Sequence, residues 1–498
     1  MEVMHSLIHN DKKNKNSRTG FIDLNSILQW INILFCILFI YIFKENGPTQ
    51  YVNKYTIYLG VLLSLQIAVF LYFEKKRRDP FVLLLCFQMV MYFILRIVSL
   101  SLDFYSVVFE RFPFEASNLN NAILFILFAN ISLYLGLILN KVKAISDNPL
   151  AELKSQPKNA YNVIIVLFIG YLMGLSGTLG FVVVDAFFSI LGALFIKLSV
   201  ILFMIIVYLF MFKNKLPKSI FNILLLGLLL FILIQTLTGS RSAILTIINF
   251  AIFSLLAIHG SIKIKKWTLM GFLILIPLMV ILFLMATFLR PRLQEKRAVI
   301  GSETFEVIGQ FDVLQTMGND AKIVLAPVFD RIGFLDYTAE TIANSDKYYP
   351  ILNPLYFLKS TIDNVLTPGF DVFDVPMSSN AMRFMYMKNF GPPLKSKVTA
   401  ETYQSDEFTL YGEFYVMFGK WFSLVPIFFI GFITKRIYLK IKDQYEYFFI
   451  FKRSIVLAVF YTLLNSFGID WLLLDILGFI FTYKIFKTFF KFYKISST

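Results

Sequence analysis

The turn at residues 238–242 places an arginine between two long apolar runs, FNILLLGLLLFILI and AILTIINFAIFSLLAI. Gly239 permits the reversal, and Ser240 or Thr238 can accept hydrogen bonds from the first free N–H groups of the following helix. Arg241 then stands at the start of that helix, beside the positive end of its dipole. A helix N-terminus combined with the forked donors of a guanidinium suits an anion, above all phosphate. For this turn alone, an interfacial arginine that only fixes the turn is an equal alternative.

Several ionisable side chains lie within or at the ends of apolar runs, where they are costly and their positions therefore carry information. They are Arg96, Lys197, Arg241, Arg290, Arg292, Arg297 and Asp475. With the topology given below, all of them fall in the outer half of the bilayer or at its outer edge. Snorkelling to the nearest interface explains Lys197 taken alone. For the set, we expect a cationic chamber open to the outer leaflet and an inner half of the bundle without charge.

The composition indicates a membrane protein. Of the 498 residues, 57% are hydrophobic and 16% are charged, whereas a soluble chain carries about a quarter charged residues. The net charge of +15 comes from Lys and Arg in short connections between apolar runs, which is typical of membrane topology and not of a nucleic-acid partner. Cys36 and Cys86 both lie in apolar runs, so neither a disulfide framework nor a thiolate metal site is expected. The polar start lacks the pattern of a removable signal peptide.

Apolar runs near the length of a bilayer span recur along the chain, which indicates an all-α polytopic fold. We expect about twelve spanning helices, near residues 27–43, 55–73, 81–102, 122–139, 161–179, 193–212, 219–237, 243–258, 268–289, 420–434, 447–465 and 471–485.

The connections between these segments alternate in charge. Lys and Arg gather before the first segment, after each even-numbered segment and after the last. Because basic connections stay in the cytoplasm, we expect both termini to be cytoplasmic and the one long connection to be outside. The expected organisation is spans in residues 1–289, a large extracytoplasmic loop in 290–419, and further spans with a cytoplasmic tail in 420–498.

The expected topology restricts the chemistry to the outside. The cytoplasmic connections are about 25 residues or shorter, whereas a nucleotide-binding domain needs on the order of 100 residues. In the long connection, residues 305–317 and 321–343 carry apolar residues at helical spacing and are expected to lie as amphipathic helices on the bundle or the membrane. Residues 348–397 are rich in Pro, Asn, Gly and Asp and are expected to be irregular. Residues 401–419 lead into the tenth span.

Three short pieces, taken in order and with this topology, give a resemblance to a known family. They are Gly239-Ser240-Arg241-Ser242, then Arg331 with Leu335-Asp336 in DRIGFLD, and Gly412-Glu413 in YGEFYVMFG. With them the chain resembles, over most of its length, the Wzy-type polymerases of O-antigen and capsule repeat units. These belong to the O-antigen polymerase and ligase superfamily. The family is similar in architecture to the C-type membrane glycosyltransferases.

The resemblance implies a glycosyltransferase reaction in the outer leaflet of a bacterial inner membrane. A growing glycan would pass from undecaprenyl pyrophosphate to the next lipid-linked repeat unit, without a nucleotide sugar or a cofactor, to build O-antigen or capsular polysaccharide. The implied partners are the lipid-linked glycans, the bilayer and a chain-length regulator in the membrane.

Fixed cations would lower the barrier of such a reaction, because charge develops on the departing pyrophosphate. We assign this catalytic role to Arg241 and Arg290. The residues expected to bind pyrophosphate or glycan are Arg96, Lys197, Ser240, Arg292, Arg331 and Asp336.

The acceptor hydroxyl needs orientation and a base. His5, His9 and His259 all lie on the expected cytoplasmic side, so a carboxylate must serve. Glu413 is the first candidate, although a helix-start carboxylate or an ion-pair partner of Lys420 is a slightly better account of that residue alone. Weaker candidates are Glu401, Asp406, Glu407 and Asp336.

Two other functions stay open. An O-antigen ligase is expected to have a histidine in the large loop, which this chain lacks there. A lipid-linked oligosaccharide flippase is expected to have polar groups through both halves of the bundle and some pseudo-symmetry. Asp363, Asp371 and Asp374 carry oxygen ligands suited to a divalent cation, but in a Pro- and Gly-rich segment such residues more often form turns. We therefore expect no metal.

Overall fold

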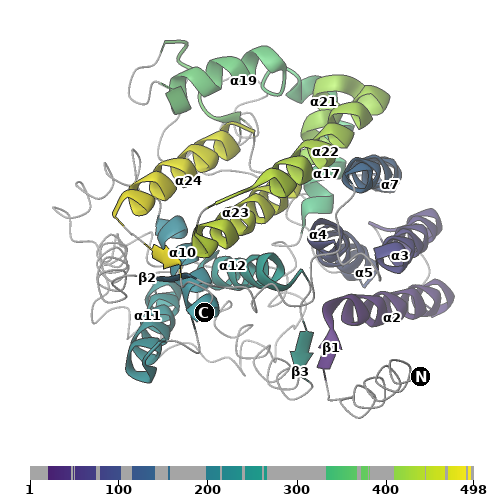
Figure 1. The fold of residues 1–498 in the computed structure, drawn as a ribbon. Helices are drawn as coiled ribbons and strands as arrows, with labels where there is room; N and C mark the ends of the chain where they lie inside the picture. The colour runs from purple at the N-terminus through teal and green to yellow at the C-terminus, as the bar shows by residue number, and fades with distance from the viewer. Residues whose placement is uncertain are drawn as a thin grey trace, which may run out of the picture.

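The computed structural model describes most of the helical core of the chain (Figure 1). The described residues are 21–45, 49, 51–74, 79–102, 115–140, 155–157, 198–212, 216–237, 242–260, 263–265, 333–366, 372–378, 381, 409–443, 445–465, 469–489 and 492–494. Within them the chain is all-α apart from two antiparallel pairs of three-residue strands.

The helices are α2 (Leu24–Glu45), α3 (Lys54–Glu74), α4 (Pro80–Gln88), η1 (Met89–Ile94), α5 (Leu95–Ser101), α7 (Ala116–Leu139), α10 (Leu198–Phe212), α11 (Lys218–Leu237), α12 (Ser242–His259), α17 (Phe334–Ala343), α18 (Ser345–Tyr348), α19 (Pro354–Thr361), η3 (Ile362–Leu366), α21 (Leu410–Phe422), α22 (Leu424–Lys440), α23 (Glu446–Leu464) and α24 (Ile469–Phe489). The strands are β1 (Phe21–Asp23), β2 (Ser155–Pro157), β3 (Lys263–Lys265) and β4 (Phe492–Lys494).

Five described helical segments are long and apolar enough to cross a membrane. They are Leu24–Ile42, Lys54–Glu74, Pro80–Ser101, Ala116–Leu139 and Glu446–Leu464, and the bent pair α21–α22 raises the number to six if it counts as one span. By length and composition these helices are those of a helical membrane protein. The expected spans at 161–179 and 268–289 lie outside the described residues, so the number of about twelve stays a prediction.

The third segment is one continuous helix with a π-helical stretch inside it. Asp79 caps its start by accepting a hydrogen bond from the N–H of Phe81, and Pro80 occupies the first turn, where its missing donor costs nothing. The π-helix η1 then interrupts the α-helical ladder before α5. One π turn changes which side chains face each neighbour, and such stretches are frequent at functional sites.

Two glycines let α7 and α22 pack backbone to backbone. A Cβ atom at Gly136 would collide with the carbonyl oxygen of Phe428, and one at Gly431 would lie 2.6 Å from the carbonyl oxygen of Leu133. Ser132 adds a hydrogen bond of 2.6 Å from its hydroxyl to the carbonyl oxygen of Leu424. Small residues allow this close approach between helices in a membrane. The contact fixes α22 against α7.

The chain bends sharply between α21 and α22, by 118°. Gly419 lies at the bend with φ 74°, a left-handed conformation that favours glycine. The bend turns α21 away from the direction of α22 and lays it against α17. Figure 1 shows α21 above α22 and α17 below the label of α22, with α7 beside them.

The segment that the charge pattern assigns to the outside, here called the outer segment, is more helical at residues 354–366 than its composition indicates. We expected irregular backbone at 348–397, but α19 and η3 occupy 354–366. The expectation is wrong here because Asn353 and Pro354 together start a helix, with the Asn353 side chain accepting from the N–H of Tyr356. The segment also has a small core of its own, formed by Tyr348, Ile351, Leu352, Tyr356, Phe357, Val375, Ala381 and Val416.

Connections that the charge pattern assigns to one side of the membrane meet one another in the structure. Strand β1 pairs with β3, and β2 pairs with β4. Asp79 forms a buried ion pair with Lys435. The pair joins the start of α4 to the C-terminal part of α22. The sequence placed both residues outside their spans, whereas Asp79 caps α4 and α22 continues to Lys440.

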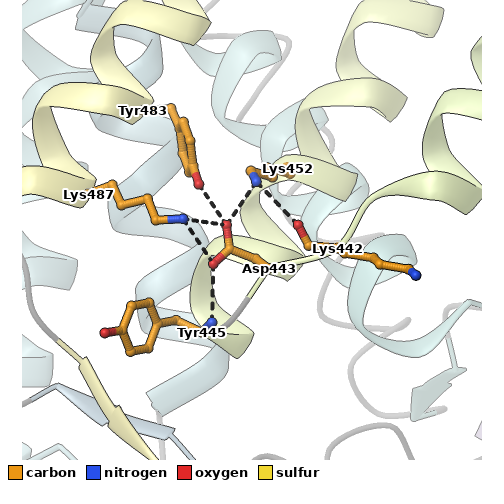
Figure 2. Close-up of polar contacts among 6 residues, drawn as sticks. All are labelled: Lys442, Asp443, Tyr445, Lys452, Tyr483 and Lys487. Atoms are coloured by element: carbon orange, nitrogen blue, oxygen red, sulfur yellow. Dashed lines mark hydrogen bonds and ion pairs between the residues drawn. The ribbon is translucent and has the colours of Figure 1, made fainter.

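Asp443 ties three segments together in the connection between α22 and α23 (Figure 2). Its carboxylate accepts from the Tyr483 hydroxyl at 2.6 Å and from the backbone N–H of Tyr445 at 3.1 Å, and it pairs with Lys452 at 2.8 Å and Lys487 at 3.2 Å. Burial raises the pKa of Asp443, but the hydrogen bonds from these partners outweigh that effect and lower the pKa to about 2. The cluster therefore fastens the C-terminal part of α24 to the start of α23.

Replacing Asp443 with Asn should destabilise the detergent-solubilised protein at neutral pH, because two lysines lose their shared counter-charge. The folded-state pKa of about 2 lies below the ordinary value of 3.8. The carboxylate's contribution to the free energy of unfolding is therefore present when the pH is above the ordinary value, and it is lost as the pH falls towards 2. The difference in melting temperature between wild type and Asp443→Asn should therefore be large at pH 7 and smaller at pH 3. Asp346→Asn, at an exposed site, is the matched control. Equal melting temperatures at pH 7 would contradict this role.

Candidate functional site

Buried polar side chains gather where α17 and α21 pack against the third helical segment and α7. Each of them is at most 3% exposed. They are Arg96, Asn130, Asp336, Thr338, Glu340, Thr341, Thr409 and Glu413. A polar group removed from water is costly unless it finds partners, so the partners of these side chains define what the site does.

An ion pair between Arg96 and Asp336 lies at the centre of this cluster. The Arg96 Nε lies 3.0 Å from both carboxylate oxygens of Asp336, and a terminal guanidinium nitrogen makes a further, shorter contact with Oδ2. The other terminal nitrogen donates to the Ser99 hydroxyl at 3.4 Å. Both side chains are almost wholly withdrawn from solvent. The pair joins the third helical segment to a residue 240 positions later in the chain.

The π-helical stretch before Arg96 is held from two directions. Tyr92, within η1, shares a hydrogen bond of 2.7 Å with the hydroxyl of Tyr461 on α23. Its ring also meets Phe334, the first residue of α17, edge to face at 4.6 Å between centroids. Gln88, just before η1, donates to the carbonyl oxygen of Leu464 at 3.0 Å. These contacts fix the helix from which the Arg96 side chain extends.

Helices α17 and α21 meet through small and hydroxyl-bearing residues. The hydroxyls of Thr338 and Thr409 lie 2.6 Å apart, and Thr409 also caps α21 by accepting from the N–H of Gly412. A Cβ atom at Gly412 would lie 3.1 Å from the Cβ of Thr341. The neighbouring Tyr411 donates to Asn130 of α7 at 2.6 Å. The contact brings the GFLD and YGEFY stretches of the sequence together.

Two glutamates complete the acidic side of the cluster. Glu413 is wholly buried in the first turn of α21, where a carboxylate also complements the helix dipole. Lys420, its alternative partner from the sequence, has its ammonium over the ring of Trp421 at 5.4 Å. Glu340 accepts a hydrogen bond of 2.6 Å from Tyr348. Sequence reasoning missed Glu340, although it stands four residues after Asp336 and therefore on the same helix face.

The predicted site residues divide into two groups. Arg96, Asp336 and Glu413 are brought to one region by the Arg96–Asp336 pair and by the packing of α17 on η1 and α21. The others lie outside the described residues: Lys197, Ser240, Arg241, Arg290, Arg292 and Arg331. Asn130, Thr338 and Thr409 also belong to the cluster and carried no sequence signal that would distinguish them from core residues.

Of the three aspartates considered as metal ligands, Asp363 has a structural role. Asp363 is buried, and its two oxygens accept from the backbone N–H groups of Val372, Phe373 and Val375 at 2.9–3.1 Å. Asp374 has a left-handed φ of 53°, and Asp371 lies outside the described residues. Among the residues that the structure describes, no three His, Cys, Asp or Glu side chains are placed to hold a metal ion.

Comparison of the chain with protein-family models, with curated proteins and with solved structures finds no match.

The Arg96–Asp336 pair gives a test of the site's construction. Removing one partner leaves the other charge buried and uncompensated, which costs about 3–5 kcal/mol. Arg96→Met and Asp336→Leu should each lower the melting temperature strongly, whereas the double variant should be more stable than either single variant. Thermal unfolding of the purified protein measures all three, with the exposed Lys347→Met as control. Losses that simply add in the double variant would show that the two side chains do not pair.

Proposed function

We propose that the protein is a Wzy-type polymerase that joins undecaprenyl-pyrophosphate-linked oligosaccharide repeat units at the outer leaflet of a bacterial inner membrane. One observation carries the proposal. Two of the three stretches that give the family resemblance, Leu335-Asp336 and Gly412-Glu413, lie on helices that pack together. The first of them is paired with Arg96, a buried cation of the apolar helix bundle.

In the proposed reaction, a hydroxyl oxygen of the acceptor repeat unit attacks the anomeric carbon of the donor glycan. The bond from that carbon to the pyrophosphate oxygen breaks, and the lipid pyrophosphate leaves with the bonding electrons. The acceptor proton passes to a carboxylate, for which Glu413 is the first candidate. Arg241 and Arg290 stabilise the charge on the departing pyrophosphate, and Ser240, Arg292, Arg331 and Lys197 complete its binding site.

Arg96 and Asp336 have a more specific role in this scheme. Arg96 directs most of its described donors to Asp336 and Ser99, so the pair holds α17 against the third helical segment. We propose that the Arg96–Asp336 pair contributes to substrate binding by positioning α17.

The proposed topology follows from the charged connections. Both termini lie in the cytoplasm, residues 290–419 face outward, and the full chain forms about twelve spans. The β1–β3 and β2–β4 pairs support this arrangement, because each joins two connections that the charge pattern assigns to the same side. A membrane-bound chain-length regulator is the proposed protein partner.

Purified protein in liposomes should lengthen glycan from undecaprenyl-pyrophosphate-linked repeat units alone. The donor carries its own activation, so ATP and nucleotide sugar should be unnecessary, and a chelator should leave the rate unchanged because arginines meet the pyrophosphate. Gel ladders of the lipid-linked product measure the outcome. A strict need for nucleotide sugar would overturn the polymerase assignment. Loss of activity in chelator that magnesium restores would overturn the metal-free mechanism.

Arg241→Ala should abolish polymer at normal protein level, and Arg241→Lys should recover only part of it, because lysine supplies charge without the bidentate fork. Single-repeat product on the cell surface should remain, which distinguishes loss of a polymerase from loss of a flippase or ligase. Arg436→Ala, an exposed cation of α22, is the matched control. Full polymer in the alanine variant would show that Arg241 only anchors its turn.

A further inference from the structure

Helix α19 is apolar on two faces. Tyr356 and Phe357 are buried in the small core of the outer segment. On the other face, Leu355 and Leu358 are 60% and 58% exposed, and their spacing of three places them side by side on the helix. A helix of a water-soluble surface would carry polar residues on that face.

The exposed apolar surface continues beyond α19. Leu366, at the end of η3, is 65% exposed, and Val372 is 62% exposed. The hydrogen bonds of Asp363 hold Val372 and Phe373 beside η3, and the ammonium of Lys359 lies 5.6 Å from the centre of the Phe373 ring. We call this surface the outer apolar patch; its members are Leu355, Leu358, Leu366, Val372 and Phe373.

We propose that the outer apolar patch rests in the lipid of the leaflet on its side of the bundle, so that α19 is an interfacial helix. Three observations select lipid as the occupant. First, α19 and η3 both contact α24, an apolar helix whose own Leu473 and Ile480 are exposed. The helix that carries the patch therefore packs on a helix with exposed apolar side chains of its own.

Second, the leucines of α19 are exposed to a similar degree as those of a helix long enough to span a membrane. On α3, Leu62 and Leu65 are 50% and 52% exposed. Figure 1 shows α19 beyond the upper end of α24 and next to α21, at one end of the bundle. An interfacial helix would lie at such an end.

Third, the charge beside the patch suits lipid headgroups. Lys359 lies next to Phe373, and Lys347 is exposed one helix earlier. Lysines at the edge of an apolar face place their ammonium groups among phosphates while the face enters the acyl region. The proposal concerns only how the segment meets the membrane, and it holds whether or not the protein polymerises glycan.

The test measures the depth of single labelled sites in the full-length protein. In a variant with Cys36→Ser and Cys86→Ala, an environment-sensitive fluorophore is attached to Leu358→Cys or, as the matched control, to Asp346→Cys on exposed α18. Each protein is placed in phosphatidylcholine and phosphatidylglycerol nanodiscs, which leave both faces accessible. Lipid with a nitroxide high on the acyl chain should quench site 358 at least twofold more than site 346, and aqueous iodide should do the reverse.

Val372→Cys provides a second site on the patch should the label at 358 disturb folding, and it should follow site 358. Quenching of both patch sites by iodide to the extent seen at site 346 would place the patch in water and overturn the proposal. Protection from both quenchers would mean that protein covers the patch, either a second copy of this chain or another partner. This result would also overturn the proposal.

Discussion

A buried ion pair between Arg96 and Asp336 sets the arrangement of everything around it. Two charges withdrawn from water are stable only together and with good geometry, because the desolvation penalty of each is several kcal/mol. The third helical segment therefore cannot present Arg96 at this position unless α17 supplies Asp336, and α17 cannot be buried here without Arg96. This mutual dependence commits a segment beyond residue 330 to a specific place on the helix bundle.

Backbone geometry then determines what lies beside that pair. The π-helix η1 and the Tyr92 contacts fix the face on which Arg96 emerges. Gly136 and Gly431 permit the close packing of α22 on α7, and the chain bends next to α22, at Gly419. The bend brings α21 and its buried Glu413 over α17. An apolar bundle thus holds a polar cluster, and the reaction we propose would use such a site to exclude water and orient its two substrates.

Hydropathy and charge predicted the helical membrane class, because a bilayer imposes both an apolar length and a bias of basic connections. The position of a charge within an apolar run singled out Arg96, whereas the family resemblance singled out Asp336 and Glu413. The sequence did not predict that Arg96 pairs with Asp336. Each residue was selected for a different reason, and no local pattern links positions 240 residues apart. The helix at Pro354 was missed because Pro and Asn were read as turn residues when together they form a helix start.

The most direct test of the account asks whether the two motif-bearing helices touch. In protein lacking Cys36 and Cys86, Thr338→Cys and Thr409→Cys replace hydroxyls that lie 2.6 Å apart, close enough for a disulfide of about 2.05 Å after a small adjustment. Mild oxidation of membranes, followed by denaturation and maleimide-polymer labelling, should leave the double variant unlabelled until it is reduced, while each single variant stays labelled. A double variant that takes up two labels after oxidation would show that α17 and α21 do not meet, and would contradict the site described.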